Sequence, residues 1–352
     1  MEKLQSYNVS EKLIGLISIL VICCFLVIVA GLRPPGFDPD YMDYLYTLDT
    51  KPDEFNYLQF EPLYWLLVYL NQILFSGSSY SFFFIFALLY VSISVYAIKK
   101  YSSNFFLSFL IFIFIFYPNF GLIQIRNGVA IAIFWLALHD FIEGRIKLYF
   151  FKCFLASLFH YSLIISFFLI FLRKQKFNKI FYIFLPIVSI LIGELLLTPD
   201  KILLWSYYLP TFLQFKIQAY INLVLSGTDN SLTKINIINL KSLSYFIIYY
   251  LSLLINAKHK FFEAKQVIYL KLFGFGIFIW FAFNIIPVFS FRFSEIFFSI
   301  LVFLIPDLIK RFNFFSKILV VQITLLYILF LSLNIYVRHD LFDWNAFRNF
   351  LI

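Results

Sequence analysis

The chain has 352 residues, of which 62% are hydrophobic and only 13% are charged, and its mean hydropathy is +0.88. A soluble domain carries about 25% charged residues, spread among its apolar ones, whereas here the apolar residues form long uninterrupted blocks. These proportions exclude a soluble enzyme and predict an α-helical membrane protein. The net charge of +9 comes from short basic clusters between the blocks, as the positive-inside rule predicts for cytoplasmic loops, so we expect no nucleic-acid partner.

Apolar segments that approach the roughly 20 helical residues needed to cross a bilayer core recur along the whole chain. They predict an all-α, polytopic integral membrane protein with about 10 to 12 transmembrane segments, some of them re-entrant or half helices. In chain order, the segments cover approximately residues 14–32, 62–75, 81–98, 105–117, 122–138, 148–172, 180–197, 235–255, 267–286, 293–309 and 318–337.

Two longer polar stretches, 33–61 and 198–234, interrupt these segments, and neither is large enough to form a domain of its own. We therefore predict a single transmembrane domain over residues 1–352. Basic residues cluster in three of the short connections and near the N-terminus, which places those connections and the N-terminus in the cytoplasm. Both polar stretches then lie on the outer side of the membrane.

Two short basic connections would lie on the outer side if every segment crossed the membrane once, namely 99–100 and 145–147. The conflict disappears if residues 62–75 form a re-entrant or interfacial element and residues 148–172 form two half-helices that meet near His160. Non-helical backbone at membrane depth is tolerated where it lines a cavity enclosed by protein. We therefore expect a cavity near Glu61 and His160 that opens to the outer side.

Residues 124–130 read Gln-Ile-Arg-Asn-Gly-Val-Ala and put Arg126 at the start of an apolar segment. Gly128 and Ala130 leave room for another backbone or a ligand to come close. An arginine in this position can present its planar guanidinium group to a phosphate or diphosphate. The alternative is an interfacial side chain that extends to the lipid headgroups.

Two further arginines on the predicted outer side are candidates for the same ligand. Arg292 lies between two phenylalanines shortly after Pro287, where it could face Arg126 as a second diphosphate ligand. The alternative for Arg292 is an ion pair with Glu295 on the same helix. Arg33, which follows the first apolar segment, is the third candidate.

Carboxylates and tyrosines also gather on the predicted outer side, with Asp40, Tyr41 and Tyr44 in the first polar stretch and Glu61 at its end. Aromatic faces stack on sugar rings, and carboxylates bind sugar hydroxyls or remove a proton from them. His160, in the middle of an apolar segment, is another candidate base. The alternatives are an acidic loop that is merely solvated and a histidine that only packs.

The sequence contains no Walker loop and no GxSxG or HExxH motif. Its three cysteines lie within apolar segments and form no pattern typical of zinc ligands. We therefore predict no metal site and no cofactor.

Taken in order, these elements resemble the EpsG/Wzy-type family of bacterial O-antigen and exopolysaccharide polymerases. The resemblance covers roughly residues 30–310, and its specificity lies in the combination of several short motifs. The matching pieces are Asp40-Tyr41 with Tyr44, Glu61 before an apolar run, Gln124-x-Arg126-x-Gly128-x-Ala130, Phe159-His160-x-Ser162, and Arg292.

The resemblance implies a metal-independent glycosyltransferase of the bacterial inner membrane, surrounded by membrane lipid. It would join oligosaccharide repeat units carried on undecaprenyl diphosphate at the periplasmic face, and a single displacement would invert the anomeric configuration. The sugar, the linkage and the binding of a chain-length regulator do not follow from the sequence. The implied site residues are Arg33, Arg126 and Arg292 for the diphosphate, Asp40, Glu61 or His160 for the base, and Tyr41 and Tyr44 for the saccharide.

Three other functions stay open at this point. A flippase for lipid-linked saccharides would also need cationic groups, but we would expect internal repeats and cations along a path through the membrane. An O-antigen ligase would share the topology and the chemistry and would differ only in its acceptor. In a scaffolding membrane protein, the same charges would serve packing alone.

Overall fold

A computed structural model describes residues 2–38, 40–57, 59–172, 177–209, 211–226, 239–258 and 263–338, which form helices and no strand. The last part of the second polar stretch, residues 227–234, lies outside these ranges. Among the described residues, four helices are long and apolar enough to cross a membrane, and two pairs of helices bent by 81° and 43° raise this number to six if each pair is one span. Five shorter apolar helices accompany them. The predicted all-α, polytopic membrane fold is therefore confirmed.

The helices fall into two halves along the chain. The first half comprises α1 (Glu2–Gly31), α2 (Tyr41–Leu48), the 3₁₀ turn η1 (Pro52–Glu54), α3 (Pro62–Phe75), α4 (Ser79–Tyr101), α5 (Phe105–Ile111), the π-helical η2 (Phe112–Phe116) and η3 (Pro118–Ile123), α6 (Ile125–Ile142), α7 (Ile146–Phe159) and the 3₁₀ helix η4 (Tyr161–Phe171). The second half comprises α8 (Lys179–Leu195), α9 (Pro199–Ser206), α10 (Thr211–Ser226), α11 (Leu240–Lys258), α12 (Ala264–Ala282), α13 (Pro287–Phe298), α14 (Leu301–Ile309) and α15 (Phe314–Arg338).

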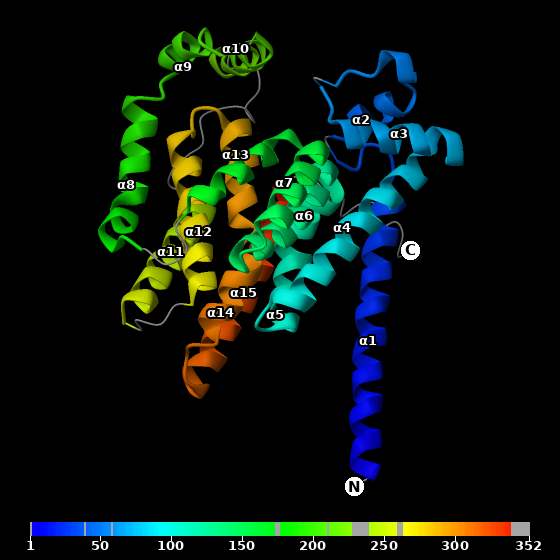
Figure 1. Ribbon diagram of the computed structural model, residues 1–352, viewed down its shortest axis with the longest axis vertical. Helices are drawn as coiled ribbons and strands as arrows, with labels where there is room; N and C mark the ends of the chain where they lie inside the picture. The colour runs from blue at the N-terminus through cyan, green and yellow to red at the C-terminus, as the bar shows by residue number, and fades with distance from the viewer. Residues whose placement is uncertain are drawn as a thin grey trace.

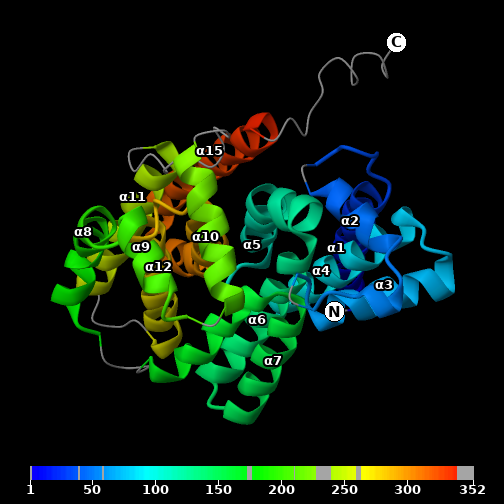
Figure 2. The ribbon, with the colours of Figure 1, turned by 90° about the horizontal axis from the view of Figure 1, so that it is seen from above.

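The described parts of both polar stretches lie at the same end of the helix bundle. Figure 1 shows α2 and α3 at the upper end on one side and α9 and α10 at the upper end on the other, whereas α1 begins at the opposite end. Seen from above, α5 and α6 lie between the group α1–α4 and the group α8–α12 (Figure 2).

Helix α6 forms the centre of the bundle, and α1 forms its edge. Within the candidate spans, 83% of the α6 residues are buried by other parts of the protein, against 17% in α1. The exposed apolar side chains of α1 suit contact with lipid, which is the environment that the sequence composition predicts. Residues at the ends of α6 are consequently surrounded by several other helices.

The chain has both features that the orientation argument requires, a break near His160 and a short helix at residues 62–75. Helix α7 ends at Phe159, His160 has extended backbone with φ −155° and ψ 118°, and η4 begins at Tyr161. The predicted break near His160 is thus confirmed. Helix α3 has only 14 residues, too few for a straight crossing, and Pro62 starts it with the φ angle that a first helical turn requires.

Gly128 allows α6 to begin against the π-helical segment. A Cβ atom at this position would lie 2.2 Å from the backbone oxygen of Phe120 in η3, so that only glycine fits. The close backbone approach predicted for Gly128 is confirmed. Because α6 starts here, its first residues, Arg126 and Asn127, are held at a fixed position beside the end of η3.

Candidate active site

A small open cavity of about 220 Å³, counting its mouth, is lined in part by the start of α2, the helix at the upper end of the bundle in Figure 1. It brings together side chains from the start of α2, the start of α6, the break before η4, and α13. The lining residues are Asp40, Tyr44, Gln124, Arg126, Asn127, His160 and Arg292.

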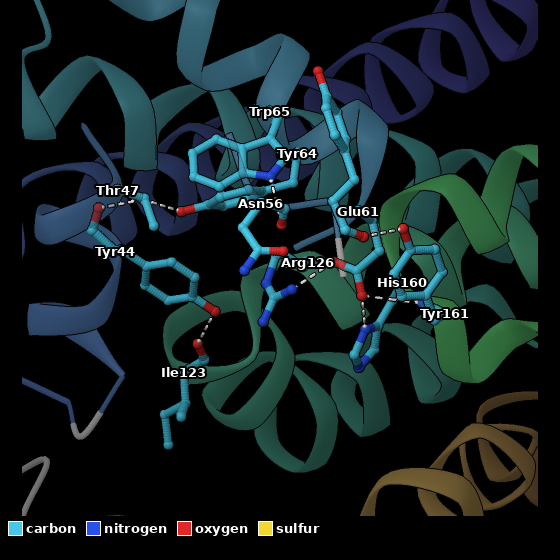
Figure 3. A network of polar contacts seen from close by, with 11 residues as sticks. Tyr44, Thr47, Asn56, Glu61, Tyr64, Trp65, Ile123, Arg126, His160 and Tyr161 are labelled. Carbon is cyan, nitrogen blue, oxygen red and sulfur yellow. Dashed lines mark hydrogen bonds and ion pairs between the residues drawn. The ribbon is translucent and has the colours of Figure 1, made fainter. Parts of the chain in front are cut away.

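Glu61 links two of the lining residues from behind the cavity (Figure 3). One carboxylate oxygen, Oε2, accepts a hydrogen bond of 2.5 Å from Nη1 of Arg126. The other oxygen, Oε1, lies 2.7 Å from Nδ1 of His160 and accepts the backbone N–H of Tyr161 at 3.1 Å. The side chain of Glu61 is only 3% exposed, so a single buried carboxylate fixes both Arg126 and His160.

The surroundings of Glu61 keep it ionised. Burial on its own would raise the pKa of this carboxyl group, but the hydrogen bond with His160 and the charge of Arg126 outweigh burial and lower the pKa to about 2. An ionised carboxylate can only accept hydrogen bonds, so Nδ1 of His160 carries the proton. In the neutral imidazole, Nε2 is then left as a hydrogen-bond acceptor.

Arg126 is held in a buried aromatic setting. Its guanidinium carbon lies 4.6 Å from the ring centre of Phe60 and 5.3 Å from that of Tyr64, and its side chain is 16% exposed. Its Nε atom is buried and has no hydrogen-bond partner among the described residues. The side chain therefore remains at the cavity instead of extending to lipid headgroups, and part of its donor capacity is left for a ligand.

Arg292 lies in the same cavity and has no hydrogen-bond or ion-pair partner within the described part of the chain. The alternative ion pair with Glu295 is not formed, because Glu295 instead binds Nζ of Lys241 at 3.1 Å and Nδ2 of Asn119 at 2.6 Å. Two arginine side chains thus line one cavity, and a guanidinium group can bind phosphate oxygens through two parallel N–H donors.

Asp40 supplies a carboxylate beside the two arginines. It is half-buried, and no hydrogen-bond or ion-pair partner of its carboxylate lies within the described residues. Burial raises the pKa of Asp40 above its ordinary value of 3.8, although the charges of Arg292 and Arg126 act in the opposite direction. Asp40 is therefore a stronger base than an exposed aspartate.

Tyr44 joins α2 to the end of η3. Its hydroxyl donates to the backbone oxygen of Ile123 at 3.2 Å, and the ring lines the cavity (Figure 3). Thr47, one turn later in α2, forms a buried hydrogen bond with the hydroxyl of Tyr64 in α3. These contacts fix the short helix α2, and hence Asp40 at its start, against the core of the bundle.

Arg33 and Tyr41 lie outside the cavity lining. Arg33 is buried, donates to the backbone oxygen of Leu122, forms an ion pair of 3.3 Å with Asp38, and lies 3.8 Å from the ring centre of Phe83. Tyr41 packs on the same ring with a centroid distance of 4.9 Å. Arg33 anchors the segment that precedes α2, Tyr41 anchors the first turn of α2, and we do not include either residue in the proposed site.

Two lining residues were not assigned a role from the sequence, Gln124 and Asn127. Both lie close to Arg126 in the sequence, and both carry a polar amide group at the start of an otherwise apolar segment. This polarity is the sequence feature from which a role in the site could have been predicted. Within the part of the chain that the structure describes, no group of three histidine, cysteine or acidic residues is arranged to hold a metal ion.

The fold and the cavity define a multi-pass α-helical membrane protein with a charged, partly enclosed site at one end of its bundle. The family model of EpsG matches residues 16–349, so the chain belongs to the EpsG family, and the predicted family is confirmed. No curated protein and no solved structure matches the chain. Membership of this family supports a polysaccharide polymerase-type role in general.

Proposed function

We propose that this protein is a glycosyltransferase that polymerises oligosaccharide repeat units carried on undecaprenyl diphosphate, at the periplasmic face of the bacterial inner membrane. The N-terminus would lie in the cytoplasm, and residues 1–352 would act as one transmembrane domain. The observation that carries the proposal is the shared cavity of Arg126, Arg292 and Asp40, because it combines two diphosphate ligands with a base.

The reaction would be a single displacement at the anomeric carbon of the growing chain. A hydroxyl oxygen of the incoming repeat unit forms the new bond to this carbon, and the bond from the carbon to the diphosphate oxygen breaks. Undecaprenyl diphosphate leaves with the electron pair of that bond. Arg126 and Arg292 would stabilise the negative charge that develops on the leaving group, which is the step where preorganised cationic groups contribute most.

Asp40 is the base that the geometry favours. Both carboxylate oxygens of Glu61 are occupied, and Nδ1 of His160 is occupied by Glu61, whereas the carboxylate of Asp40 has no partner among the described residues. Asp40 would take the proton from the attacking hydroxyl. Binding of the diphosphate would neutralise the nearby arginines and raise the pKa of Asp40 further, which improves it as a base.

Glu61 and His160 would have supporting roles in this site. Glu61 holds Arg126 in place and fixes the tautomer of His160, so it is a positioning residue. His160 would present Nε2 to a sugar hydroxyl, and Tyr44 would contribute its ring to the wall against which a sugar packs.

The test is the size distribution of surface polysaccharide from a deletion strain that carries the wild-type gene, Arg126→Ala or Arg292→Ala. Membrane levels of each variant are measured in parallel. Wild type is expected to restore a ladder of chain lengths, and the deletion and both variants are expected to leave single repeat units. Arg145→Ala is the matched control, since this arginine is 42% exposed at the other end of α6, and it should restore the ladder.

Other outcomes would point to the alternative functions. If the deletion removes even single repeat units from the surface, a flippase or a ligase replaces the polymerase. If both arginine variants restore a full ladder at normal membrane levels, the cavity does not bind the diphosphate. A product in which the anomeric configuration is retained would contradict the single displacement.

A further inference from the structure

A chain of hydrogen bonds leads from the cavity wall to an ion pair behind it. Nδ2 of Asn127 donates to Oε1 of Gln124 at 3.0 Å, and Nε2 of Gln124 donates to Oδ1 of Asn119 at 3.4 Å. Nδ2 of Asn119 then donates to Oε2 of Glu295 at 2.6 Å, and the other oxygen of Glu295 accepts from Nζ of Lys241 at 3.1 Å. Three amides and one carboxylate therefore form a relay from α6 to α13 and α11.

The carboxylate at the end of the relay determines the direction of every bond in it. An ionised Glu295 has no proton to donate, so Asn119 must turn its NH₂ group toward it. The oxygen of Asn119 then faces Gln124, which must donate in turn, and the same reasoning applies to Asn127. Asn127, at the cavity end, therefore donates from its nitrogen within the relay, and its oxygen Oδ1 is left without a partner in the relay.

The free group at the cavity end is a buried acceptor. Asn127 is 2% exposed and lines the cavity, and its Oδ1 atom has no hydrogen-bond partner among the described residues. A buried polar atom without a partner is costly, and a ligand that supplies a donor removes this cost. The site is thus prepared for an N–H or O–H group of a ligand.

We propose that Asn127 is a hydrogen-bond acceptor for a hydroxyl or amide N–H group of the bound repeat unit, and that Glu295 sets its polarity through Asn119 and Gln124. This inference rests on the proposed function, since it assigns a saccharide contact within the same cavity. Asn127 touches the ligand, whereas Glu295 is a positioning residue that acts through the relay. A sugar that presents only an acceptor to Asn127 would be rejected, because two acceptors would face each other.

Binding is measured on the full-length protein purified in detergent, with lipid-linked repeat units extracted from the deletion strain as the probe. The rise in unfolding temperature with probe concentration gives the dissociation constant for each variant. Asn127→Ala is expected to weaken binding by about 3- to 10-fold, the range for one lost neutral hydrogen bond. Glu295→Gln is expected to weaken it in the same range, because a glutamine at that position can donate and allows the relay to reverse.

The decisive measurement is the double variant Asn127→Ala/Glu295→Gln. If Glu295 acts through Asn127, the double variant binds no more weakly than Asn127→Ala alone. If Glu295 has a merely structural effect, its loss weakens binding equally in both backgrounds, and the relay is overturned. Wild-type affinity in Asn127→Ala overturns the contact itself.

Asn284→Ala is the matched control. Asn284 is 1% exposed, donates from Nδ2 to Glu194 at 3.1 Å, and also has an Oδ1 atom without a hydrogen-bond partner in the described part of the chain, but it does not line the cavity. Its replacement should leave the affinity unchanged. A wild-type protein that binds the units but joins none would overturn the polymerase and leave the Asn127 contact standing, whereas one that binds none would overturn both.

Discussion

The two ends of helix α6 each carry a buried carboxylate between two basic side chains. Near the start of α6, Glu61 binds Arg126 and His160. At its end, Asp140 binds Nε of Arg145 at 2.8 Å and forms an ion pair with Lys152. Both carboxylates are almost fully buried, with 3% and 1% of the side chain exposed.

The partners of the two carboxylates differ in sequence distance and in exposure. Arg145 and Lys152 follow Asp140 within the α6–α7 hairpin, and 42% and 26% of their side chains are exposed. Arg126 and His160 lie 65 and 99 residues from Glu61 and are 16% and 11% exposed. The first cluster fastens two neighbouring helices, whereas the second assembles a cavity from distant segments.

Replacing each carboxylate by alanine should give the largest difference in stability and in activity between the two ends of α6. Glu61→Ala leaves Arg126 and His160 buried without their acceptor, and we expect a loss of about 3–5 kcal/mol in stability and of at least about 100-fold in polymer formation. Asp140→Ala leaves two partly exposed cations, and we expect a loss of about 1 kcal/mol. Thermal unfolding in detergent and the polysaccharide ladder, normalised to folded protein, measure both. Equal losses of activity would show that the two clusters have the same role.

The glycines at the two ends of α6 give a second contrast. Gly128→Ala forces the backbone at Phe120 to shift, and we expect a destabilisation of about 1–3 kcal/mol with a loss of activity of about tenfold or more, since Arg126 and Gln124 move with that junction. Gly144, after the end of α6, has φ +83° and open space around it. Gly144→Ala should cost about 1–2 kcal/mol through backbone strain alone and retain activity per folded molecule. Comparable activity in the two variants would contradict a special role for the η3–α6 junction.

The pH dependence of the reaction should reveal Asp40. Because the base form must be deprotonated and burial raises the pKa of Asp40, activity should fall about tenfold per pH unit as the pH drops below this raised pKa, which lies above 3.8. Glu61 remains ionised in this range. Its folded pKa of about 2 lies below 4.5, so its contribution to stability is fully present above about pH 4.5 and is lost only as the pH falls toward 2. The initial rate of polymer formation from pH 4 to 8 measures the effect.

Three variants identify the group that titrates. Asp40→Asn should reduce the rate by about 10²- to 10⁴-fold, and its residual activity should lack the acidic decline. Asp43→Asn, an exposed carboxylate on the same helix, should retain both the rate and the decline. Asp38, whose pKa burial raises to about 6, lies beside Arg33 outside the cavity lining, so Asp38→Asn tests whether its titration contributes. An acidic decline that survives in Asp40→Asn would exclude Asp40 as the base.

The sequence alone was sufficient to predict the features that depend on residues close together in the chain. Long apolar blocks predicted the helical membrane fold, and the charge pattern predicted the break at His160. Gly128 predicted a close backbone contact. Each of these features follows from the hydropathy or the steric demand of a short segment, which the printed sequence contains directly.

Only the tertiary structure decided which of the polar residues meet. It places Asp40, Tyr44, Arg126, His160 and Arg292 around one cavity, leaves Arg33 outside the lining, and pairs Glu295 with Lys241 instead of Arg292. It also adds Asn127, whose buried, unpartnered acceptor depends on Glu295, a carboxylate far along the chain. Such contacts depend on how helices pack across the bundle, and the pattern of apolar and polar residues within each helix does not specify that packing.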